Sequence, residues 1–436
     1  MISIINLDLL NIVTFLWLGF WALRAVIYIA AGNHSSMLFV ILIHFAFSGL
    51  PLLLDVLLGK PALSIFRGLY LATRDDTTSI IYCLYVSAVP VFWWWHGKIN
   101  KGLNVSGESS DITIDNAPTS FLSLRKLALY VFMLIFLISP LLAWISSPNP
   151  EVYLNYGVTV NNLFRFKAEE EYHNNIISIT CFLNLIGATG LIALQKRINI
   201  LLIFSLLPWI FLAIWLNGKR HLVVFAIVLI GYIIWYKGYL KGVRFIIALM
   251  VAVLIMSIFS SSYQTGVRGA ASDFVELYEG FRVDYGRDSN IKMAIFAELY
   301  PQELQILEYR GQTLFFYLTM YISRQSWPEK PMPYHHYVTS AAFMIPPKLW
   351  TWGLTSSFLE EAIANFSWFG MILGPSLISI ICRVGDSRSN PLISPLTVLV
   401  AILFLAVELS AFSPLFLIWL MMIFFVRPTK RIYPHR

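Results

Sequence analysis

Long apolar runs alternate with short polar connections along most of the chain. A segment that crosses about 30 Å of hydrocarbon as a helix needs roughly 17 to 25 residues. Runs of that kind fall at 8 to 31, 36 to 58, 78 to 96, 121 to 145, 174 to 194, 198 to 216, 219 to 236, 243 to 262, 355 to 382, 393 to 408 and 410 to 426. The pattern predicts an all-α, polytopic integral membrane protein of about eleven transmembrane helices.

The composition supports the same class. Hydrophobic residues make up 58% of the chain and charged residues 13%, too little charge to cover the surface of a water-soluble globule. The excess of 31 Lys and Arg over 24 Asp and Glu does not require nucleic acid as a partner, because membrane proteins collect basic residues in cytoplasmic loops. Cys83, Cys181 and Cys382 fall in or at the end of apolar runs without metal-binding or disulfide spacing, so we expect small buried hydrophobic groups.

Basic residues orient the predicted helices. The segments 195–197, 237–244 and 427–436 carry clustered positive charge, and an eleven-helix count places all three on one side, which should be cytoplasmic. The chain then divides into eight helices over 1–262, a large loop over 263–354 on the opposite face, three helices over 355–426 and a basic cytoplasmic tail over 427–436.

The large loop combines short helices with irregular backbone. Residues 289–300 have an apolar helical face and residues 312–323 are almost wholly apolar, so both are predicted to be short helices on the membrane surface or capping the bundle. Pro328, Pro331 and Pro333 prevent a continuous helix, and irregular backbone does not face lipid. This part of the loop should therefore lie outside the bilayer.

A helix-start signal follows the loop. Ser357 and Glu360 have capping-box spacing and precede an apolar run, which predicts one long helix ending near Cys382. Glu361 and Asn365 should lie at its mouth, close to the water line. No Walker loop and no glycine-rich dinucleotide fingerprint is found, so nucleotide chemistry has no support.

The same stretch carries a recognisable order of residues. Arg324 precedes Trp327-Pro-x-Lys-Pro, then come Gly353-x-Thr-x-Ser and Glu361-Ala-x-x-Asn-Phe. Over about 50 residues this order resembles the O-antigen polymerases, the Wzy-type oligosaccharide repeat-unit polymerases of bacterial envelopes. Ser367 departs from that pattern, which has glycine after Asn-Phe.

The resemblance implies a helical membrane glycosyltransferase of the GT-C-like kind in the bacterial cytoplasmic (inner) membrane, with its active face toward the periplasm. Such an enzyme transfers the growing glycan from undecaprenyl pyrophosphate to a lipid-linked repeat unit. The implied partners are these lipid-linked oligosaccharides, the bilayer and a Wzz-type chain-length co-polymerase. No cofactor is expected, because the pyrophosphate linkage supplies the energy.

Cationic residues are the candidates for the pyrophosphate seat. Arginine binds phosphate oxygens in pairs and keeps its proton, which suits a leaving group that gains negative charge. The turn 218–221 is basic on a face where short turns should be poor in positive charge, which favours a function for it. The candidates for pyrophosphate or glycan binding on the predicted outer face are Lys219, Arg220, Arg268, Arg282, Arg287 and Arg324. For Arg282 and Arg287, a salt-bridge network with the neighbouring Asp284 and Asp288 is an equal alternative.

The acceptor hydroxyl needs a base, and two residues are candidates. Glu361 aligns with the family's Glu-Ala-x-x-Asn-Phe, and His336 has a side-chain pKa naturally near working pH. Glu360 is a further glycan-binding candidate, with helix capping as its structural alternative. The pair His335 and His336 has the alternative of packing in the loop with its tyrosine neighbours. A metal site is discounted, because no third ligand stands at suitable spacing.

Two other functions remain open at this point. An O-antigen ligase-type transferase shares the donor and the membrane face and differs in its acceptor. A flippase or transporter for the same lipid-linked sugars belongs to another class, in which paired halves with helices broken near the midplane are typical. The concentration of polar residues in one outer loop favours the enzyme.

Overall fold

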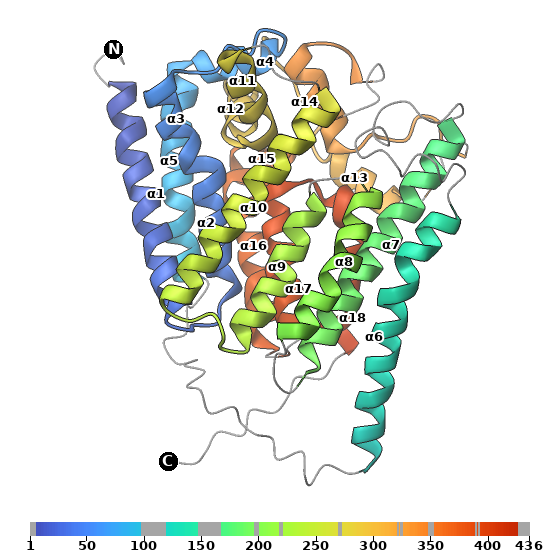
Figure 1. Ribbon diagram of the computed structural model, residues 1–436. Helices are drawn as coiled ribbons and strands as arrows, with labels where there is room; N and C mark the ends of the chain where they lie inside the picture. The colour runs from blue at the N-terminus through green and yellow to red at the C-terminus, as the bar shows by residue number, and fades with distance from the viewer. Residues whose placement is uncertain are drawn as a thin grey trace. The chain divides into compact units, whose positions relative to one another are not determined.

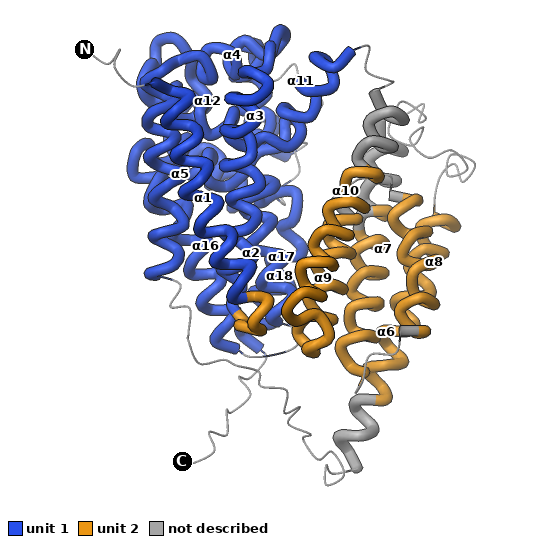
Figure 2. The backbone as a smooth tube through the Cα atoms, turned by 60° about the vertical axis from the view of Figure 1, so that its left-hand side comes forward, with its two compact units in different colours: residues 1–28, 35–101, 272–436 blue, residues 29–34, 102–271 orange. Residues whose placement is uncertain are grey.

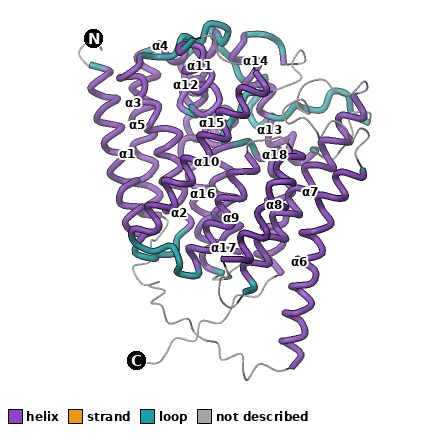
Figure 3. Tube along the Cα trace, viewed as in Figure 1, coloured by secondary structure: helices purple, strands orange, loops and turns teal. Residues whose placement is uncertain are grey.

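The computed structural model describes residues 6–96, 119–146, 167–195, 200–217, 221–268, 273–320, 322, 326–347, 353–388, 390 and 393–425. These residues form helices joined by loops, and no strand occurs among them (Figure 1, Figure 3). The all-helical fold class is therefore confirmed for this part of the chain. The chain separates into two compact units: residues 1–28, 35–101 and 272–436 form unit 1, and residues 29–34 and 102–271 form unit 2 (Figure 2).

Unit 1 contains the helices from both ends of the chain. In chain order its helices are α1 (Leu7–Ala30, whose last two residues belong to unit 2), α2 (Ser36–His44), η1 (Phe45–Gly49), α3 (Leu50–Leu58), α4 (Arg67–Arg74), α5 (Asp76–His96), α11 (Phe274–Tyr285), α12 (Asp288–Leu299), α13 (Gln312–Thr319), α14 (Tyr334–Phe343), α15 (Phe358–Phe366), η6 (Ser367–Phe369), α16 (Gly370–Ser387), α17 (Ile393–Ala406) and α18 (Leu409–Phe425). The short helices α4, α11, α12 and α14 gather at the end of unit 1 where α1 begins (Figure 1). The large loop thus contributes folded structure to this unit.

Five helical segments are long and apolar enough to cross a membrane: Leu7–Ala30, Ser36–Leu58, Asp76–His96, Lys126–Ile145 and Phe358–Ser387. Each lies where the hydropathy pattern predicts a span. Where the side chains are described, the other apolar helical stretches are 10–17 residues long, namely Ile179–Ala193, Leu201–Leu216, Val223–Tyr236, Val243–Phe259, Ile393–Ala406 and Leu409–Phe425. A helical membrane protein is consistent with these segments, and the count of eleven spans stays a prediction.

The second span changes its helix type halfway. Between α2 and α3 the segment η1 is a π-helix, and Pro51 follows at the start of α3. Proline lacks the N–H that an α-helix would use there, and a π turn absorbs such a local mismatch. The arrangement carries Asp55 on α3, where it is 7% exposed in an otherwise apolar run.

The predicted single helix over 355–382 is wrong, because the chain breaks after Phe366. Gly370 and Gly374 of α16 lie against Ala362 and Leu359 of α15, and a methyl group at Gly370 would stand 2.0 Å from the Ala362 carbonyl oxygen. Residues eight apart in a continuous helix are separated by about 12 Å. The short helix α15 therefore folds back on α16, which a hydropathy plot cannot reveal.

The helix near 289–300 was predicted to lie on the membrane surface or to cap the bundle, and the surface position is wrong. All residues of α12 from Asp288 to Ala297 are buried, and α12 packs against α4, α5 and α15. Polar side chains occupy its first turns, and two of them, Asp288 and Lys292, form ion pairs within unit 1. By contrast α13 keeps Leu318 83% exposed, as expected of a surface helix.

Unit 2 contains α6 (Thr119–Ile145), α7 (Lys167–Ala193), α8 (Ile200–Asn217), α9 (His221–Tyr236) and α10 (Val243–Arg268). The helix α7 contacts α6, α8 and α9. Gly187 and Gly190 allow α6 to approach closely, because a side chain at either position would collide with Phe136 or Phe132. Small residues at a helix crossing are the usual means of close packing between apolar helices in membranes.

Candidate functional site

The residues of the polar motif converge on the short helix α15. Glu361 and Asn365 are four residues apart and so share one helix face. The Thr313 hydroxyl donates to Glu361 Oε1 at 2.6 Å, and the Tyr317 hydroxyl donates to Oε2 at 2.9 Å. The Asn365 amide donates to Thr313 Oγ1 at 2.7 Å. Glu361 is thus a buried carboxylate with a hydroxyl on each oxygen, and α13 supplies both.

Glu360 points to another side of α15 and has a structural task. Its carboxylate accepts from both the backbone N–H and the hydroxyl of Ser357, which confirms the capping box. The carboxylate is fully buried. Glu360 therefore caps the start of α15. Its role in glycan binding stays a prediction.

A second buried carboxylate belongs to the same region. Glu408 lies between α17 and α18 and is 4% exposed. It accepts from the backbone N–H of His335 at 2.7 Å and lies 2.6 Å from the ring Nδ1, so it caps the start of α14 and orients the imidazole. Burial alone would raise the pKa of Glu408, but the contact with His335 lowers it below its usual value. Glu408 is therefore held as a carboxylate.

The two carboxylates act on the same tyrosines. Burial, followed by the charges of Glu361 and Glu408, raises the pKa of Tyr317 well above its usual value. Burial and a set of four carboxylates that includes these two do the same to Tyr334. We call Thr313, Tyr317, Tyr334, His335, Glu361, Asn365 and Glu408 the carboxylate cluster.

Some polar atoms of this region are buried without a hydrogen-bond partner in the described part of the chain. They include the Tyr334 hydroxyl, Asn365 Oδ1 and the Ser356 hydroxyl. Buried polar groups in folded proteins are nearly always paired, so each exception asks for an explanation. The Tyr334 hydroxyl and Asn365 Oδ1 are thus polar groups of this region that the described residues leave without a partner.

Close packing explains why the motif has glycine at position 353. A methyl group at Gly353 would stand 2.1 Å from the His335 ring carbon Cδ2, so only glycine fits against the imidazole. Further along the motif, the Thr355 carbonyl accepts from the Asn290 amide at 2.8 Å. These contacts fix the loop that precedes α15 to both α14 and α12.

His335 and Glu408 were not among the predicted catalytic residues, which named His336. The sequence prediction placed both histidines in a loop, and this is wrong, because they occupy the first turn of α14. The two adjacent rings lie against each other with their centroids 4.5 Å apart, and the ring of His335 meets Glu408. Glu408 is an acid between the last two apolar runs, a position where the sequence alone marks an ionisable residue as a functional candidate.

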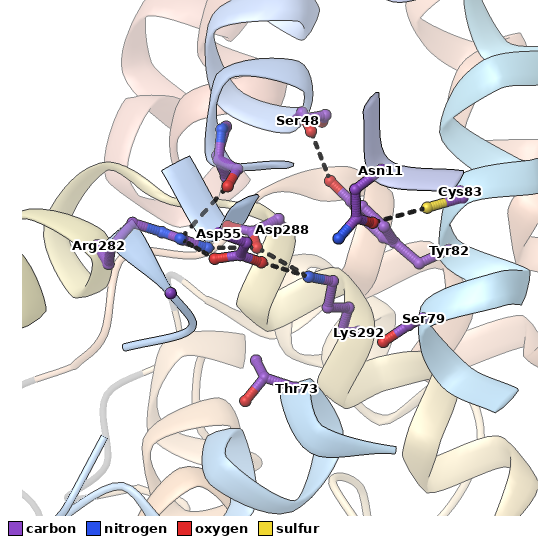
Figure 4. A network of polar contacts seen from close by, with 12 residues as sticks. Asn11, Ser48, Asp55, Thr73, Ser79, Tyr82, Cys83, Arg282, Asp288 and Lys292 are labelled. Carbon is purple, nitrogen blue, oxygen red and sulfur yellow. Dashed lines mark hydrogen bonds and ion pairs between the residues drawn. The ribbon is translucent and has the colours of Figure 1, made fainter. Parts of the chain in front are cut away.

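Arg282 lies in a different buried network (Figure 4). Its guanidinium forms ion pairs with Asp55 of α3 and, at 2.7 Å, with Asp288 of α12. Lys292 lies 3.2 Å from Asp288 and 3.5 Å from Asp55. The Tyr278 hydroxyl accepts from Arg282 at 2.9 Å. We call Asp55, Arg282, Asp288 and Lys292 the ion-pair network.

The ion-pair network contains two acids and two bases and is formally neutral. Burial alone would raise the pKa of Asp288 and lower that of Lys292, but their opposite charges reverse both shifts, so the pKa of Asp288 is lowered and that of Lys292 is raised. Arg282 is 1% exposed and has its guanidinium committed to two carboxylates. Of the predicted salt-bridge partners, Asp288 is paired with Arg282, but the network is buried and its other acid is Asp55. Asp55 was missed, although an acid inside an apolar run is a recognised signal.

The other cationic candidates are distributed as follows. Arg287 is buried, donates to the carbonyls of Ala406 and Asp284, and lies over the ring of Phe47. Lys219, Arg220 and Arg324, together with the side chain of Arg268, lie outside the described residues. The gathering of arginines around one pyrophosphate seat therefore stays a prediction.

The backbone explains the position where the chain departs from the family pattern. Ser367 has φ 56° and ψ −145°, a conformation that is essentially reserved for glycine. It forms the break between α15 and α16. Its hydroxyl donates to Glu298 Oε2 at 2.6 Å.

No protein-family model, curated protein or solved structure matches the chain. The likeness to O-antigen polymerases thus rests on the motif residues of the sequence alone.

Proposed function

We propose that the chain is a polyprenyl-pyrophosphate-dependent glycosyltransferase of the O-antigen polymerase type. The observation that carries the proposal is the carboxylate cluster, in which Glu361 and Asn365 of the family-like motif meet a Glu408–His335 pair next to an unpaired Tyr334 hydroxyl. A histidine held by a carboxylate is a common form of general base. The apolar helices that could span a membrane suit a lipid-linked substrate.

The reaction follows from these groups. Glu408 binds the Nδ1 side of His335, so Nε2 keeps the lone pair and takes the proton of the acceptor hydroxyl. The acceptor oxygen forms a bond to the anomeric carbon of the donor glycan. The bond from that carbon to the pyrophosphate oxygen breaks, and the electron pair leaves with undecaprenyl pyrophosphate.

The roles of the other residues complete the mechanism. Glu361 is the alternative base, and its two hydroxyl partners fix it in place. The leaving pyrophosphate needs cationic groups, and Lys219, Arg220, Arg268 and Arg324 remain the candidates that the sequence offers for this role. Arg282 and Arg287 serve this role only if their buried contacts open. The site then lies on the periplasmic face of the inner membrane, where a Wzz-type co-polymerase would set chain length.

The test is complementation of a strain that lacks the gene. Native protein is compared with His335→Gln and Glu361→Gln at equal abundance, and the surface polysaccharide is read as a ladder on a gel. The matched control is His336→Gln, one residue away on the same helix. We expect His335→Gln to lose the ladder while single repeat units stay attached, and His336→Gln to keep it.

Other outcomes separate the alternatives. Loss of the single unit as well would indicate ligation or transport, because polymerisation alone does not remove it. A normal ladder in both His335→Gln and Glu361→Gln would refute the proposed site. A ladder lost only in His336→Gln would restore the sequence-based choice of base.

A further inference from the structure

A cavity lies beside the carboxylate cluster in unit 1. It has a volume of about 270 Å³ and is formed by the end of α12, the segment 301–310 and Ala364 of α15. In α15, Ala364 directly precedes Asn365 of the cluster. On the other side of the cavity, Arg310 is three residues before Thr313 of the cluster. The cavity is thus a neighbour of the carboxylate cluster along the chain, although its lining consists of other residues.

One wall carries a carboxylate held in a fixed orientation. Arg310 binds both oxygens of Glu298, at 2.5 and 2.7 Å, and also donates to the Ala364 carbonyl at 2.7 Å. The Ser367 hydroxyl donates to Glu298 Oε2 at 2.6 Å. The Glu298 side chain is 6% exposed while that of Arg310 is 56% exposed. A paired guanidinium and carboxylate thus face the cavity with defined geometry.

The strained backbone of Ser367 supports a purpose for this arrangement. A serine in a glycine conformation persists only where its surroundings determine it, and such residues cluster at binding sites. Glycine at this position would be relaxed but would not reach Glu298. The serine hydroxyl therefore provides a hydrogen bond to Glu298 that compensates for the strained backbone.

A second carboxylate completes the polar lining. Glu308 accepts from the Gln312 amide at 3.2 Å, and its backbone N–H donates back to the same side chain at 3.0 Å. Tyr309 also lines the cavity and is 50% exposed, while Leu304 and Leu307 are buried and form an apolar part. Two acids and one base give the lining a formal charge of −1, which disfavours anions.

We infer that this cavity binds one uncharged sugar residue of the glycan, as a subsite next to the bond-forming centre. Sugars present several hydroxyl donors and an apolar ring face, which match fixed carboxylates, a guanidinium, an aromatic ring and leucine side chains in one pocket. The inference deepens the proposed function and rests on it for the identity of the glycan. Acidic sugars are excluded by the two carboxylates.

The test uses the purified full chain in detergent and free sugars as probes. Saturation-transfer NMR is recorded with D-glucose, D-galactose, L-rhamnose and N-acetyl-D-glucosamine at millimolar concentration, and with D-glucuronate as the anionic probe. We expect saturation of the ring protons of at least one uncharged sugar and none of glucuronate. Glu298→Gln should weaken binding about tenfold or more, because a charge-assisted hydrogen bond is lost.

Two variants keep the test decisive. Tyr309→Ala changes an exposed side chain and should also weaken binding without affecting the fold. Glu303→Gln is the matched control, because this exposed acid belongs to the same segment and does not line the cavity. Absence of binding by every uncharged sugar, or binding that neither Glu298→Gln nor Tyr309→Ala weakens, would overturn the inference, as would preferential binding of glucuronate.

The same variants separate this inference from the proposed function. If the ladder is lost in His335→Gln but sugar binding is absent or insensitive to Glu298, the cavity assignment fails and the enzyme stands. If the ladder is normal in His335→Gln and Glu361→Gln while sugar binding depends on Glu298, the polymerase site fails and a sugar-binding cavity stands.

Discussion

Replacing Arg282 by glutamine tests whether the ion-pair network stabilises unit 1 or serves the substrate. The substitution leaves Asp55 and Asp288 with Lys292 as their remaining cation, so the buried network changes from neutral to one negative charge. Breaking a buried ion pair by removing one partner costs about 3–5 kcal/mol. At roughly 2–4 °C per kcal/mol for a folding unit of this size, the midpoint of thermal unfolding should fall by about 6–20 °C.

The assay is thermal unfolding in detergent, followed with a thiol-reactive dye. Cys83 and Cys382 are free and buried in unit 1, so they react when the unit opens. The control is Arg67→Gln, which changes an exposed arginine at the start of α4. Surface substitutions usually change stability by no more than about 0.5 kcal/mol, so this control should shift the midpoint by only about 1–2 °C.

A double variant sharpens the test. Arg282→Gln combined with Asp55→Asn returns the network to a neutral Asp288–Lys292 pair, so part of the lost stability should be recovered. Contacting residues of one network couple by about 0.5–3 kcal/mol. Additive losses in the double variant would refute the reasoning. Native stability of Arg282→Gln with loss of the polysaccharide ladder would instead support the sequence-based role in pyrophosphate binding.

Three further outcomes are expected. Ser367→Gly should change stability little, because relief of about 1–3 kcal/mol of backbone strain offsets a lost hydrogen bond of similar size. Ser367→Ala keeps the strain and loses the hydrogen bond, so its free energy of unfolding, measured by thermal unfolding, should fall by about 1.5–3 kcal/mol. Gly353→Ala should displace the His335 ring and reduce polymer length at unchanged protein abundance, measured on the ladder gel. The stability of the fold should decline at both extremes of pH. The lowered pKa of Asp288 gives stability that is present above about pH 4 and is lost as the pH falls further. The raised pKa of Lys292 gives stability that is present below about pH 10 and is lost as the pH rises further.

Each of these has a contrary result. Equal stability of Ser367→Ala and Ser367→Gly would mean that the backbone conformation carries no strain. A normal ladder with Gly353→Ala would remove the proposed dependence on the His335 ring. The pH profile is measured for native protein and for Asp288→Asn, and an unchanged acid limb in the variant would assign the acid-side loss to other carboxylates.

The apolar runs fixed the helices of this protein, because a helix in lipid must satisfy its own backbone and show apolar side chains over its length. The long helices α1, α5 and α6 begin and end within a few residues of their predicted limits. The capping box at Ser357 was equally readable, since it depends on residues three positions apart. Local patterns of this kind are set by near neighbours in the chain.

The break after Phe366, the burial of α12 and the two polar networks were decided by tertiary structure. Composition marks residues 358–387 as one apolar segment, yet close packing of Gly370 on α15 requires the chain to turn back. Likewise Glu408 meets His335 although 73 residues separate them. A sequence lists which charges exist, but a buried charge is stable only beside its partner, and the partner is chosen by how distant helices pack.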